Sequence, residues 1–572
     1  MPVSRPRLVE CAAVLASAFA FLLYEQLVWP WLVLGWVALV PWLAVLDRTR
    51  SLRQALRAGL LMSVALVLIV FGWFATSIQV YTGAPWALAL LVLGLLAPVM
   101  EPQFITFALA RYLARRGGAG FWRCTLVGAC IYVGTEWYWP KLFAETLGHG
   151  LYPSVLMRQA ADVAGAPGLT FVLIIANECL LATILAVASL RFPRPLRADQ
   201  GEGGSPIRLR HALAPALAPA VCVAALVFGL LAYGTWRCQQ LRADGRPADG
   251  VTAGLVQADI SQYGRLASEL GTFEAVRRIL DAHFALSSEA LGRGAVDFLM
   301  WPETVYPTTF GSPKSEEGAA FDREIGGFVT STGVPLVFGA YDAEGEDEFN
   351  AAVFLEPAQD GRVTFDTYRK ASLFPLTERV PAVLESDLVR GWLPWLGTWK
   401  PGRGAQVLPL RLRHRTLLIA PLICYDDVDA NLVIAAVRQG AELIVTLSND
   451  VWFGFGPASY GHLVIAAFRS IETRRPQLRV TNTGISAVIS PTGEFVTTAG
   501  VHQRAALVAT VTPERRATTL MLLWGDWFGP ATLACGLIVL AASLLQSTSR
   551  RGSRQPETDS RGRSYRARRS AP

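Results

Sequence analysis

Eight long apolar runs constrain the fold of this chain more than any other feature of its sequence. They lie at about 9–24, 27–46, 58–78, 86–110, 121–139, 166–190, 212–235 and 527–546. A bilayer core about 30 Å thick is crossed by about 20 helical residues, and most of these runs reach that length. The composition agrees, because 52% of the 572 residues are hydrophobic and only 17% are charged. The sequence predicts a polytopic α-helical membrane protein with eight spans.

Basic residues alternate between the loops that join these runs. Arginines are frequent before the first run and after the second, fourth, sixth and eighth, whereas the other loops carry few or none. Cytoplasmic loops are enriched in Arg and Lys, so both chain ends are predicted to be cytoplasmic. The segment between runs seven and eight is then on the periplasmic side of a bacterial cytoplasmic (inner) membrane. This distribution also accounts for the net charge of +7, so we expect no nucleic-acid partner.

Residues 240–526 differ from the rest, because charged residues become frequent and apolar runs shorten to strand length. The expected strands are Val251–Gln257, Asp297–Trp301, Pro335–Tyr341, Asn350–Leu355, Thr416–Cys424, Glu442–Leu447, Gln477–Thr481 and Ile485–Ser490. Amphipathic helices are expected between them, which is typical of a layered α/β domain. The predicted domains are a seven-helix transmembrane region at 1–239, the α/β domain at 240–526, a last transmembrane helix at 527–549 and a disordered basic cytoplasmic tail at 550–572.

Three predicted strands each end beside a residue that could carry chemistry. Glu303 follows a strand and a proline, Lys370 follows a Tyr-Arg pair, and Cys424 ends an apolar strand. A helix that begins at Cys424 would favour its thiolate through the helix dipole. Taken singly, the three have simpler explanations as a solvated Glu, a solvated Lys and a small core Cys. Together they supply a general base, a cation and a thiol nucleophile, which are the parts needed for acyl transfer through a thioester.

The order of these three residues, in the contexts WPET, YRK and CYD, resembles the Glu-Lys-Cys catalytic set of the nitrilase (carbon-nitrogen hydrolase) superfamily. The spacing from Lys370 to Glu378 and the motifs at 447–454 and 475–484 resemble its membrane branch, the apolipoprotein N-acyltransferases. Eight spans, with an insert between the seventh and eighth, fit that branch as well. The resemblance extends from about residue 5 to 546, and it implies that the insert is a nitrilase-like α-β-β-α sandwich.

The resemblance implies an acyltransferase, and no metal or nucleotide motif indicates a cofactor. An acyl chain would pass from a membrane phospholipid, through a thioester on Cys424, to the α-amino group of the N-terminal diacylglyceryl-cysteine of apolipoproteins. This would be the last step of lipoprotein maturation, with the phospholipid donor, the modified apolipoproteins and membrane lipid as partners. Glu303 would take the thiol proton. Lys370, with a backbone N–H near Tyr425, would stabilise the oxyanion.

Five more residues are implied as supporting or substrate-binding groups: Glu378, Tyr425, Asp426, Asn449 and Trp452. Glu378 would orient Lys370 or Glu303, although a surface salt bridge explains it almost as well. Tyr425 and Asp426 would hold the nucleophile loop, with a helix cap as the alternative for Asp426.

Asn449 and Trp452 would form the wall of the pocket rather than take part in the reaction. His462 could act as an acid–base group, but a lone His on a predicted helix is more often structural. A loop at 392–399 carries three tryptophans. They could pack on the core of their own domain, or they could form a lid that dips into lipid and admits acyl chains to Cys424.

The chain departs from the family pattern at five positions. Asp426 stands where a glutamate is common, and Arg265 and Leu266 replace a Lys-Trp pair. Thr377 and Arg379 replace a glycine and an aromatic residue. None of the five is a predicted reactive group, so the departures bear on the loops that face the substrate.

Other functions stay open at this point. One is a membrane-tethered nitrilase-like amidase that acts on a small amide, and another is a catalytically weak homologue that binds lipoproteins. A transporter is disfavoured, because few charged residues lie within the predicted spans. The presence of all three reactive residues favours the acyltransferase.

Overall fold

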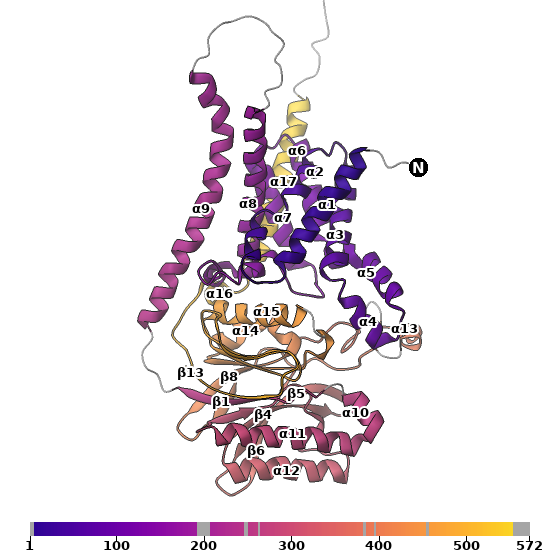
Figure 1. Cartoon of the computed structure of the whole chain (residues 1–572), viewed down its shortest axis with the longest axis vertical. Coiled ribbons are helices and arrows are strands. Elements are labelled where there is room, and N and C mark those ends of the chain that lie inside the picture. Colours follow the sequence, from indigo (N-terminus) through magenta and orange to yellow (C-terminus); the bar gives the residue numbers. More distant parts are fainter. Residues whose placement is uncertain are drawn as a thin grey trace, which may run out of the picture.

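A bundle of helices and an α/β domain lie end to end in the computed structural model of the chain (Figure 1). The structure describes residues 5–191, 206–244, 250–260, 263–380, 385–393, 396–453 and 457–552. Most of the predicted basic tail, at 553–572, therefore falls outside the described residues.

The bundle takes its helices from both ends of the sequence. They are α1 (Arg5–Tyr24), α2 (Val40–Asp47), α3 (Leu52–Val70), α4 (Phe74–Thr82), α5 (Trp86–Met100), α6 (Gln103–Arg116), α7 (Phe121–Tyr138), α8 (Ala161–Arg191), α9 (Pro206–Asp244) and α17 (Phe528–Gly552). Short 3-10 helices cover Trp31–Trp36, Leu147–Leu151 and Met157–Ala160. Apolar side chains of α17 pack on those of α7, so the last helix completes the bundle formed by the N-terminal ones.

The expected count of eight spans is not confirmed. By length and composition, five helices in the described ranges could cross a membrane: Arg7–Tyr24, Leu52–Val70, Met157–Ser189, Leu217–Ala243 and Phe528–Gln546. A sixth is possible if α5 and α6, which are bent by 44°, form one broken span. The expected run at 27–46 is divided between a 3-10 turn and the short α2, and the run at 121–139 forms α7, which carries Arg123 and Glu136.

The α/β domain contains two sheets. Its strands are β1 (Val251–Gln257), β2 (Phe298–Met300), β3 (Tyr306–Thr309), β4 (Leu336–Glu344), β5 (Asp347–Pro357), β6 (Val363–Arg369), β7 (Leu408–Arg411), β8 (Thr416–Ile423), β9 (Leu443–Ser448), β10 (Gln477–Thr481), β11 (Ser486–Ile489), β12 (Phe495–Ala499) and β13 (Ala505–Val511). One sheet has the order β13-β1-β2-β4-β5-β6, with β3 beside β4, and the other has the order β12-β11-β10-β9-β8-β7. The central strands β1, β2 and β4 are parallel, as are β8, β9 and β10.

Helices cover the outer face of each sheet. They are α10 (Tyr263–Leu270), α11 (Thr272–Gly292), α12 (Glu316–Thr332), α14 (Ala430–Arg438), α15 (Ala458–Thr473) and α16 (Leu520–Trp524). The short α13 (Asp387–Trp392) lies instead at the side of the molecule, near α4 in Figure 1. Figure 1 shows α11 and α12 beneath the first sheet, and α14 and α15 between the second sheet and the bundle. Apolar side chains from both sheets, among them Leu255, Phe298 and Ile423, form the core between them. The domain is thus the four-layer α-β-β-α sandwich that the sequence predicts.

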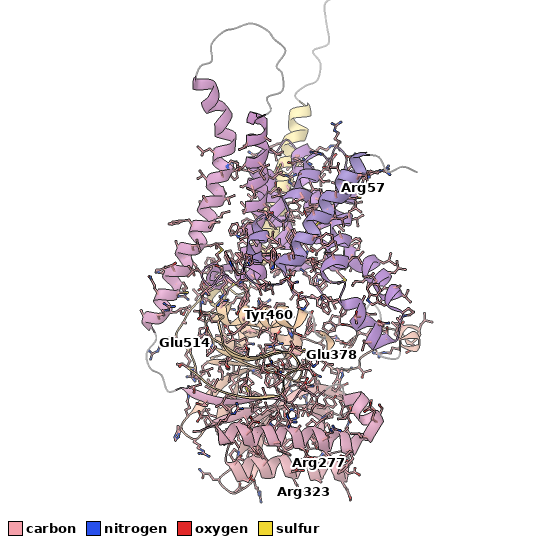
Figure 2. The ribbon with its side chains drawn as sticks, in the orientation of Figure 1. Arg57, Arg277, Arg323, Glu378, Tyr460 and Glu514 are labelled. Carbon is pink, nitrogen blue, oxygen red and sulfur yellow. The ribbon has the colours of Figure 1, made fainter. Side chains whose placement is uncertain are left out.

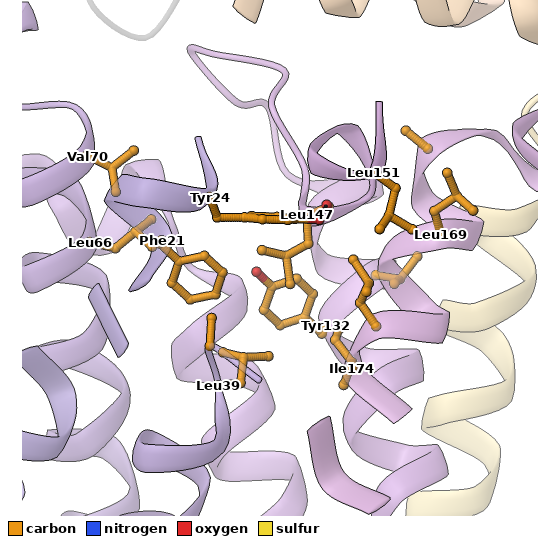
Figure 3. Packing of buried hydrophobic residues seen from close by; sticks show 14 of the residues in the cluster. Phe21, Tyr24, Leu39, Leu66, Val70, Tyr132, Leu147, Leu151, Leu169 and Ile174 are labelled. Carbon is orange, nitrogen blue, oxygen red and sulfur yellow. Dashed lines mark hydrogen bonds between the residues drawn. The ribbon is translucent and has the colours of Figure 1, made fainter. Parts of the chain in front are cut away.

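A continuous apolar core joins the domain to the bundle. Leu463, Phe468 and Ile471 of α15 belong to the same cluster of buried side chains as the bundle residues shown in Figure 3, such as Tyr24 and Leu147. The hydroxyl of Tyr24 donates a hydrogen bond to the carbonyl of Leu147 at 2.7 Å. Burial of this kind is worth about 25 cal/mol per Å² of apolar surface, so the two parts stabilise each other.

A buried ion network reinforces this junction. Asp162 of α8 accepts hydrogen bonds from Arg474, which follows α15, and from Arg237 of α9, both at 2.7 Å. Tyr233 donates to the same carboxylate at 2.6 Å. Just after it, α8 breaks at Gly165, whose positive φ of 64° would strain any other residue.

We predict that Asp162→Asn destabilises the whole chain. It leaves Arg237 and Arg474, both buried, without their carboxylate, and breaking a buried pair in this way costs about 3–5 kcal/mol. The measurement is the Tm of the purified chain in detergent. Asp360→Asn is the matched control, since its partner Arg362 is 86% exposed and such pairs contribute about 0–1 kcal/mol. Equal Tm values for both variants would contradict the role of Asp162.

Candidate active site

Glu303 projects from a tight turn that follows β2. Its backbone passes so close to β4 that a Cβ at Gly339 would lie 2.6 Å from the Cα of Glu303. Only glycine can sit there without displacing the turn, because the contact is with backbone rather than with a movable side chain. The carboxylate is 7% exposed, and burial raises its pKa, while the nearby charge of Lys370 lowers it.

Lys370 follows β6 and points at Glu303. Its Nζ lies 2.8 Å from Oε1 of Glu378 and 3.3 Å from Oε1 of Glu303, and its side chain is 2% exposed. Burial alone would lower the pKa of Lys370, but the two carboxylates hold it well above its usual value. The structure therefore brings the predicted base and cation into one ion-pair cluster, with the cation charged.

Cys424 follows β8 of the other sheet and has a φ of 48°, in the left-handed region that non-glycine residues rarely adopt. The structure differs here from the expected helix start, because Cys424 begins a 3-10 turn, Cys424–Val428, and α14 starts only at Ala430. Burial and the charge of Glu303 raise the pKa of the thiol well above its usual value, against the opposing effect of Lys370. This direction opposes the thiolate that the helix-dipole effect would favour.

Asp426 ties the loops of Cys424 and Lys370 together. One carboxylate oxygen accepts hydrogen bonds from the backbone N–H groups of Ala371 and Ser372, at 3.1 and 2.7 Å. The other accepts from the N–H of Ile423 and from the hydroxyl of Tyr368, both at 2.9 Å. All four donors are satisfied by the shorter aspartate side chain, so the departure at Asp426 leaves the loop held as predicted.

Glu378 is not a surface salt bridge. Its side chain is 17% exposed, and one oxygen accepts a 2.7 Å hydrogen bond from the backbone N–H of Phe374 while the other binds Lys370. Figure 2 shows Glu378 on the side of the α/β domain that faces the bundle. This geometry matches the expected role of orienting Lys370.

Asn350 was missed in the sequence, although it belongs to the same cluster. It lies in β5, is 5% exposed, and donates from Nδ2 to Glu303 at 2.8 Å and to Glu378 at 3.4 Å. Its Oδ1 has no hydrogen-bond partner within the described part of the chain. The available signal was a polar residue at the start of an otherwise apolar strand, Asn350–Leu355.

The remaining predicted residues are Tyr425, Asn449 and Trp452. Tyr425 packs edge-on against Phe374 at 5.2 Å and reaches the bundle with its hydroxyl. Asn449 accepts a 3.1 Å hydrogen bond from Asn482, which supports a place in the wall of the site. Trp452 lies in the 3-10 turn Val451–Phe453, but its side chain is outside the described residues.

His462 is structural, as favoured from the sequence. Its two ring nitrogens lie 2.9 Å from Asp427 and 3.0 Å from Asp450, and Arg479 binds both carboxylates. Burial would lower the pKa of His462, but Asp427 and Asp450 raise it to about 9. The imidazolium is therefore engaged on both sides, in a buried charge network behind the Cys424 turn.

The other four departures from the family pattern are Arg265, Leu266, Thr377 and Arg379. Leu266 packs at the edge of the core under the first sheet, and Thr377 and Arg379 belong to the turn that carries Glu378. The side chain of Arg265 is not among the described ones. In the loop at 392–399, Trp395 and the side chain of Trp392 are also not described, while Trp399 packs on Tyr341 at 4.7 Å.

In the described ranges, no group of three or more His, Cys, Asp or Glu side chains is arranged to hold a metal ion. The cluster instead offers a base, a fixed cation and a thiol. These groups suit acyl transfer, in which charge develops on a carbonyl oxygen.

Two known protein families match different parts of the chain. Residues 252–519 match the carbon-nitrogen hydrolase family, and residues 12–179 match the apolipoprotein N-acyltransferase N-terminal domain. An apolipoprotein N-acyltransferase of Geobacter metallireducens is 27% identical, covering 89% of this chain and 90% of that protein. One of Gloeobacter violaceus is 28% identical and covers 92% of each. A solved structure of a mutant amidase of Nesterenkonia AN1, from the nitrilase superfamily, is 18% identical, with a TM-score of 0.34 over 46% of this chain and 92% of that one.

Both the helical part and the α/β domain thus match the corresponding parts of one family. The similarity to each of these two relatives covers about nine-tenths of this chain. The chain belongs to the apolipoprotein N-acyltransferases, the membrane branch of the carbon-nitrogen hydrolase (nitrilase) superfamily.

Proposed function

We propose that this chain transfers an acyl chain from a membrane phospholipid to the α-amino group of the N-terminal diacylglyceryl-cysteine of apolipoproteins. The observation that carries the proposal is the ion-pair cluster of Glu303 and Lys370 beside Cys424, in a domain packed directly on membrane-type helices. The relatives of Geobacter metallireducens and Gloeobacter violaceus, named apolipoprotein N-acyltransferases, support the same activity.

In the first half-reaction, the Glu303 carboxylate takes the proton of the Cys424 thiol as sulfur attacks the ester carbonyl of the phospholipid. Negative charge develops on the carbonyl oxygen, and the Lys370 ammonium stabilises it. The ester C–O bond then breaks, and Glu303 returns its proton to the departing lysophospholipid oxygen. The acyl group is left on Cys424 as a thioester.

In the second half-reaction, the α-amine of the apolipoprotein attacks the thioester. Glu303 takes a proton from the attacking nitrogen, the C–S bond breaks, and the sulfur regains a proton as the amide leaves. Because the amine starts as an ammonium, one proton is released to solvent in each full cycle. The same base and cation thus serve both steps, which makes the cycle ping-pong.

The membrane gives a physical reason for this architecture. Both substrates have acyl chains, and each methylene taken from the bilayer into water costs about 0.8 kcal/mol. A site fixed against the bundle would receive both lipids where they already lie. Trp524 and Trp527, between the α/β domain and α17, have amphipathic rings of the kind enriched at membrane interfaces.

For the topology we propose eight crossings of the inner membrane, with the α/β domain at 240–526 on the periplasmic side and the tail at 550–572 in the cytoplasm. Contacts support the two proposed crossings, at 27–46 and 121–139, that are not among the candidate spans by length and composition. The loop before α7 places Gly117 against Ser543 near the far end of α17, and the loop after α7 contacts Tyr425. Asp47, at the end of α2, is paired with Arg115 at that same far end.

The first prediction concerns the intermediate. Incubated with phospholipid and no amine acceptor, the chain should accumulate an acyl group on Cys424, because water is a poor second substrate in a site that faces lipid. Intact-mass and peptide mass spectrometry detect the adduct. Lys370→Ala should slow its formation by about 10²–10³, the usual loss for an oxyanion donor.

Cys424→Ala should abolish the adduct. Cys238→Ala is the matched control, because Cys238 is a free thiol of α9 outside the site. An amidase of small soluble amides would form no lipid adduct, and neither would a homologue that only binds lipoproteins. Folded protein without acyl mass on Cys424 would therefore refute the proposed mechanism.

A further prediction concerns pH. The rate of thioester formation should rise with pH through the pKa of Glu303, because only the ionised carboxylate can take the thiol proton. Burial puts this pKa above the ordinary 4.5, and the charge of Glu378 raises it further. Glu378→Gln should therefore move the acid limb of the profile to lower pH while lowering the maximal rate. Glu385→Gln is the control, because this carboxylate is exposed and paired with Arg390, and it should leave the acid limb in place. An acid limb that does not move in Glu378→Gln would show that the charge of Glu378 does not affect the pKa of Glu303.

Orientation is tested with reporters. An enzyme that is active only in the periplasm should be active when inserted after Gly345, in the exposed turn between β4 and β5, and silent when fused after Pro572. The reason is that basic residues are retained on the cytoplasmic side. The opposite pattern would reverse the proposed topology.

A further inference from the structure

The side chain next to the nucleophile packs on its own domain through its ring and is anchored in the bundle through its hydroxyl. The hydroxyl of Tyr425 lies 3.1 Å from the carbonyl oxygens of both Lys141 and Leu142, which belong to the loop after α7. A partly buried tyrosine hydroxyl normally requires such a partner. The backbone that carries Cys424 is therefore held from two sides, by Asp426 within the α/β domain and by this loop of the bundle.

That loop is folded around a group of charges, which we call the Lys141 triad (Glu101, Glu136 and Lys141). The Nζ of Lys141 lies 3.2 Å from Glu136 and 3.7 Å from Glu101, and it donates to the backbone carbonyl of Glu145 at 2.6 Å. The hydroxyl of Thr146 donates to the other oxygen of Glu136 at 2.7 Å. The triad thus fixes both ends of the segment that presents the two carbonyls to Tyr425.

Both charge and packing hold this segment, since Phe143 within it stacks on Phe71 at 5.3 Å. A small cavity lies on its inner side, lined by the triad and by apolar side chains such as Phe21, Leu66 and Phe71. The side chains of the triad are only 7–11% exposed. Burying such charged groups costs several kcal/mol per ion, so the triad is weak evidence for a contribution to the stability of the fold. Its burial points instead to a role in positioning the loop after α7.

We infer that the Lys141 triad positions Cys424 for attack by holding the Tyr425 hydroxyl. Cys424 has a φ of 48°, and a residue in that region persists only where its surroundings impose it. Release of Tyr425 leaves the turn held by Asp426 and by Asp427, which binds His462 and Arg479, and the sulfur and the neighbouring N–H move relative to the ester. The inference rests on the proposed function, since Cys424 must be the nucleophile for its position to matter.

The experiment is a double-mutant cycle on the full chain, with the rate of thioester formation from phospholipid vesicles as the readout. The variants are Lys141→Met, Tyr425→Phe and the two combined. Each single variant should be slower by about 10–10²-fold, the usual effect of a displacement near 1 Å at a reacting centre. The double variant should be no slower than the slower single one, within twofold, because both act through one contact. Lys141→Arg, which keeps the charge, should recover most of the rate.

Arg57→Met is the matched control. It removes a salt bridge with Glu10 at the end of the bundle remote from the α/β domain (Figure 2), and its rate should stay within twofold of the unmodified chain. If Lys141→Met does not fold, the isosteric Glu136→Gln replaces it in the cycle. A normal rate in the triad variant, or multiplicative losses in the double variant, would overturn the inference while leaving the proposed function intact. Failure of the unmodified chain to form any thioester would remove the proposed function, and the inference with it.

Discussion

The buried ammonium group of Lys370 is the constraint on which the rest of the site depends. An isolated charge with a side chain 2% exposed would lose its proton or disrupt the fold, so it requires carboxylates at close range. Glu303 and Glu378 meet this need, and Asn350 binds both of them. These groups come from one sheet and Cys424 from the other, so the site exists only while the apolar core between the sheets keeps them in register.

The reactive residues could be predicted from the sequence because each one follows a strand and lies in a short, characteristic context. Asn350 could not, since its contacts cross from β5 to two loops and leave no local pattern. The charge state of Cys424 was also beyond the sequence. The effect of a helix dipole requires an α-helix at that point, whereas the chain forms a 3-10 turn there and burial raises the pKa of the thiol.

Much of the fold could be predicted from the periodicity of apolar residues in the sequence. The elements that were not predicted have identifiable physical causes. The strand expected at Val251–Gln257 is β1, because it is buried along almost its whole length. In contrast, a strand end was expected at Lys370, but the strand itself, β6, was not delimited, since four of its seven residues are polar or basic and it lies at the edge of its sheet. Among the helices, the 44° bend between α5 and α6 lies beside Pro98 and Pro102, and a 3-10 turn precedes α2, so apolar length alone could not count the spans.

The shared apolar core between α15 and the bundle has a consequence for how substrates are selected. A domain fixed in this way cannot swing relative to the bundle, so with the bundle in the bilayer, as proposed, Cys424 would stay at a constant height relative to the lipid. Only an ester carbonyl or an amine that reaches this height can react. The enzyme would then select substrates by the depth of their reactive group in the bilayer. A lipid or lipoprotein whose reactive group lies too deep would not react, even at high concentration.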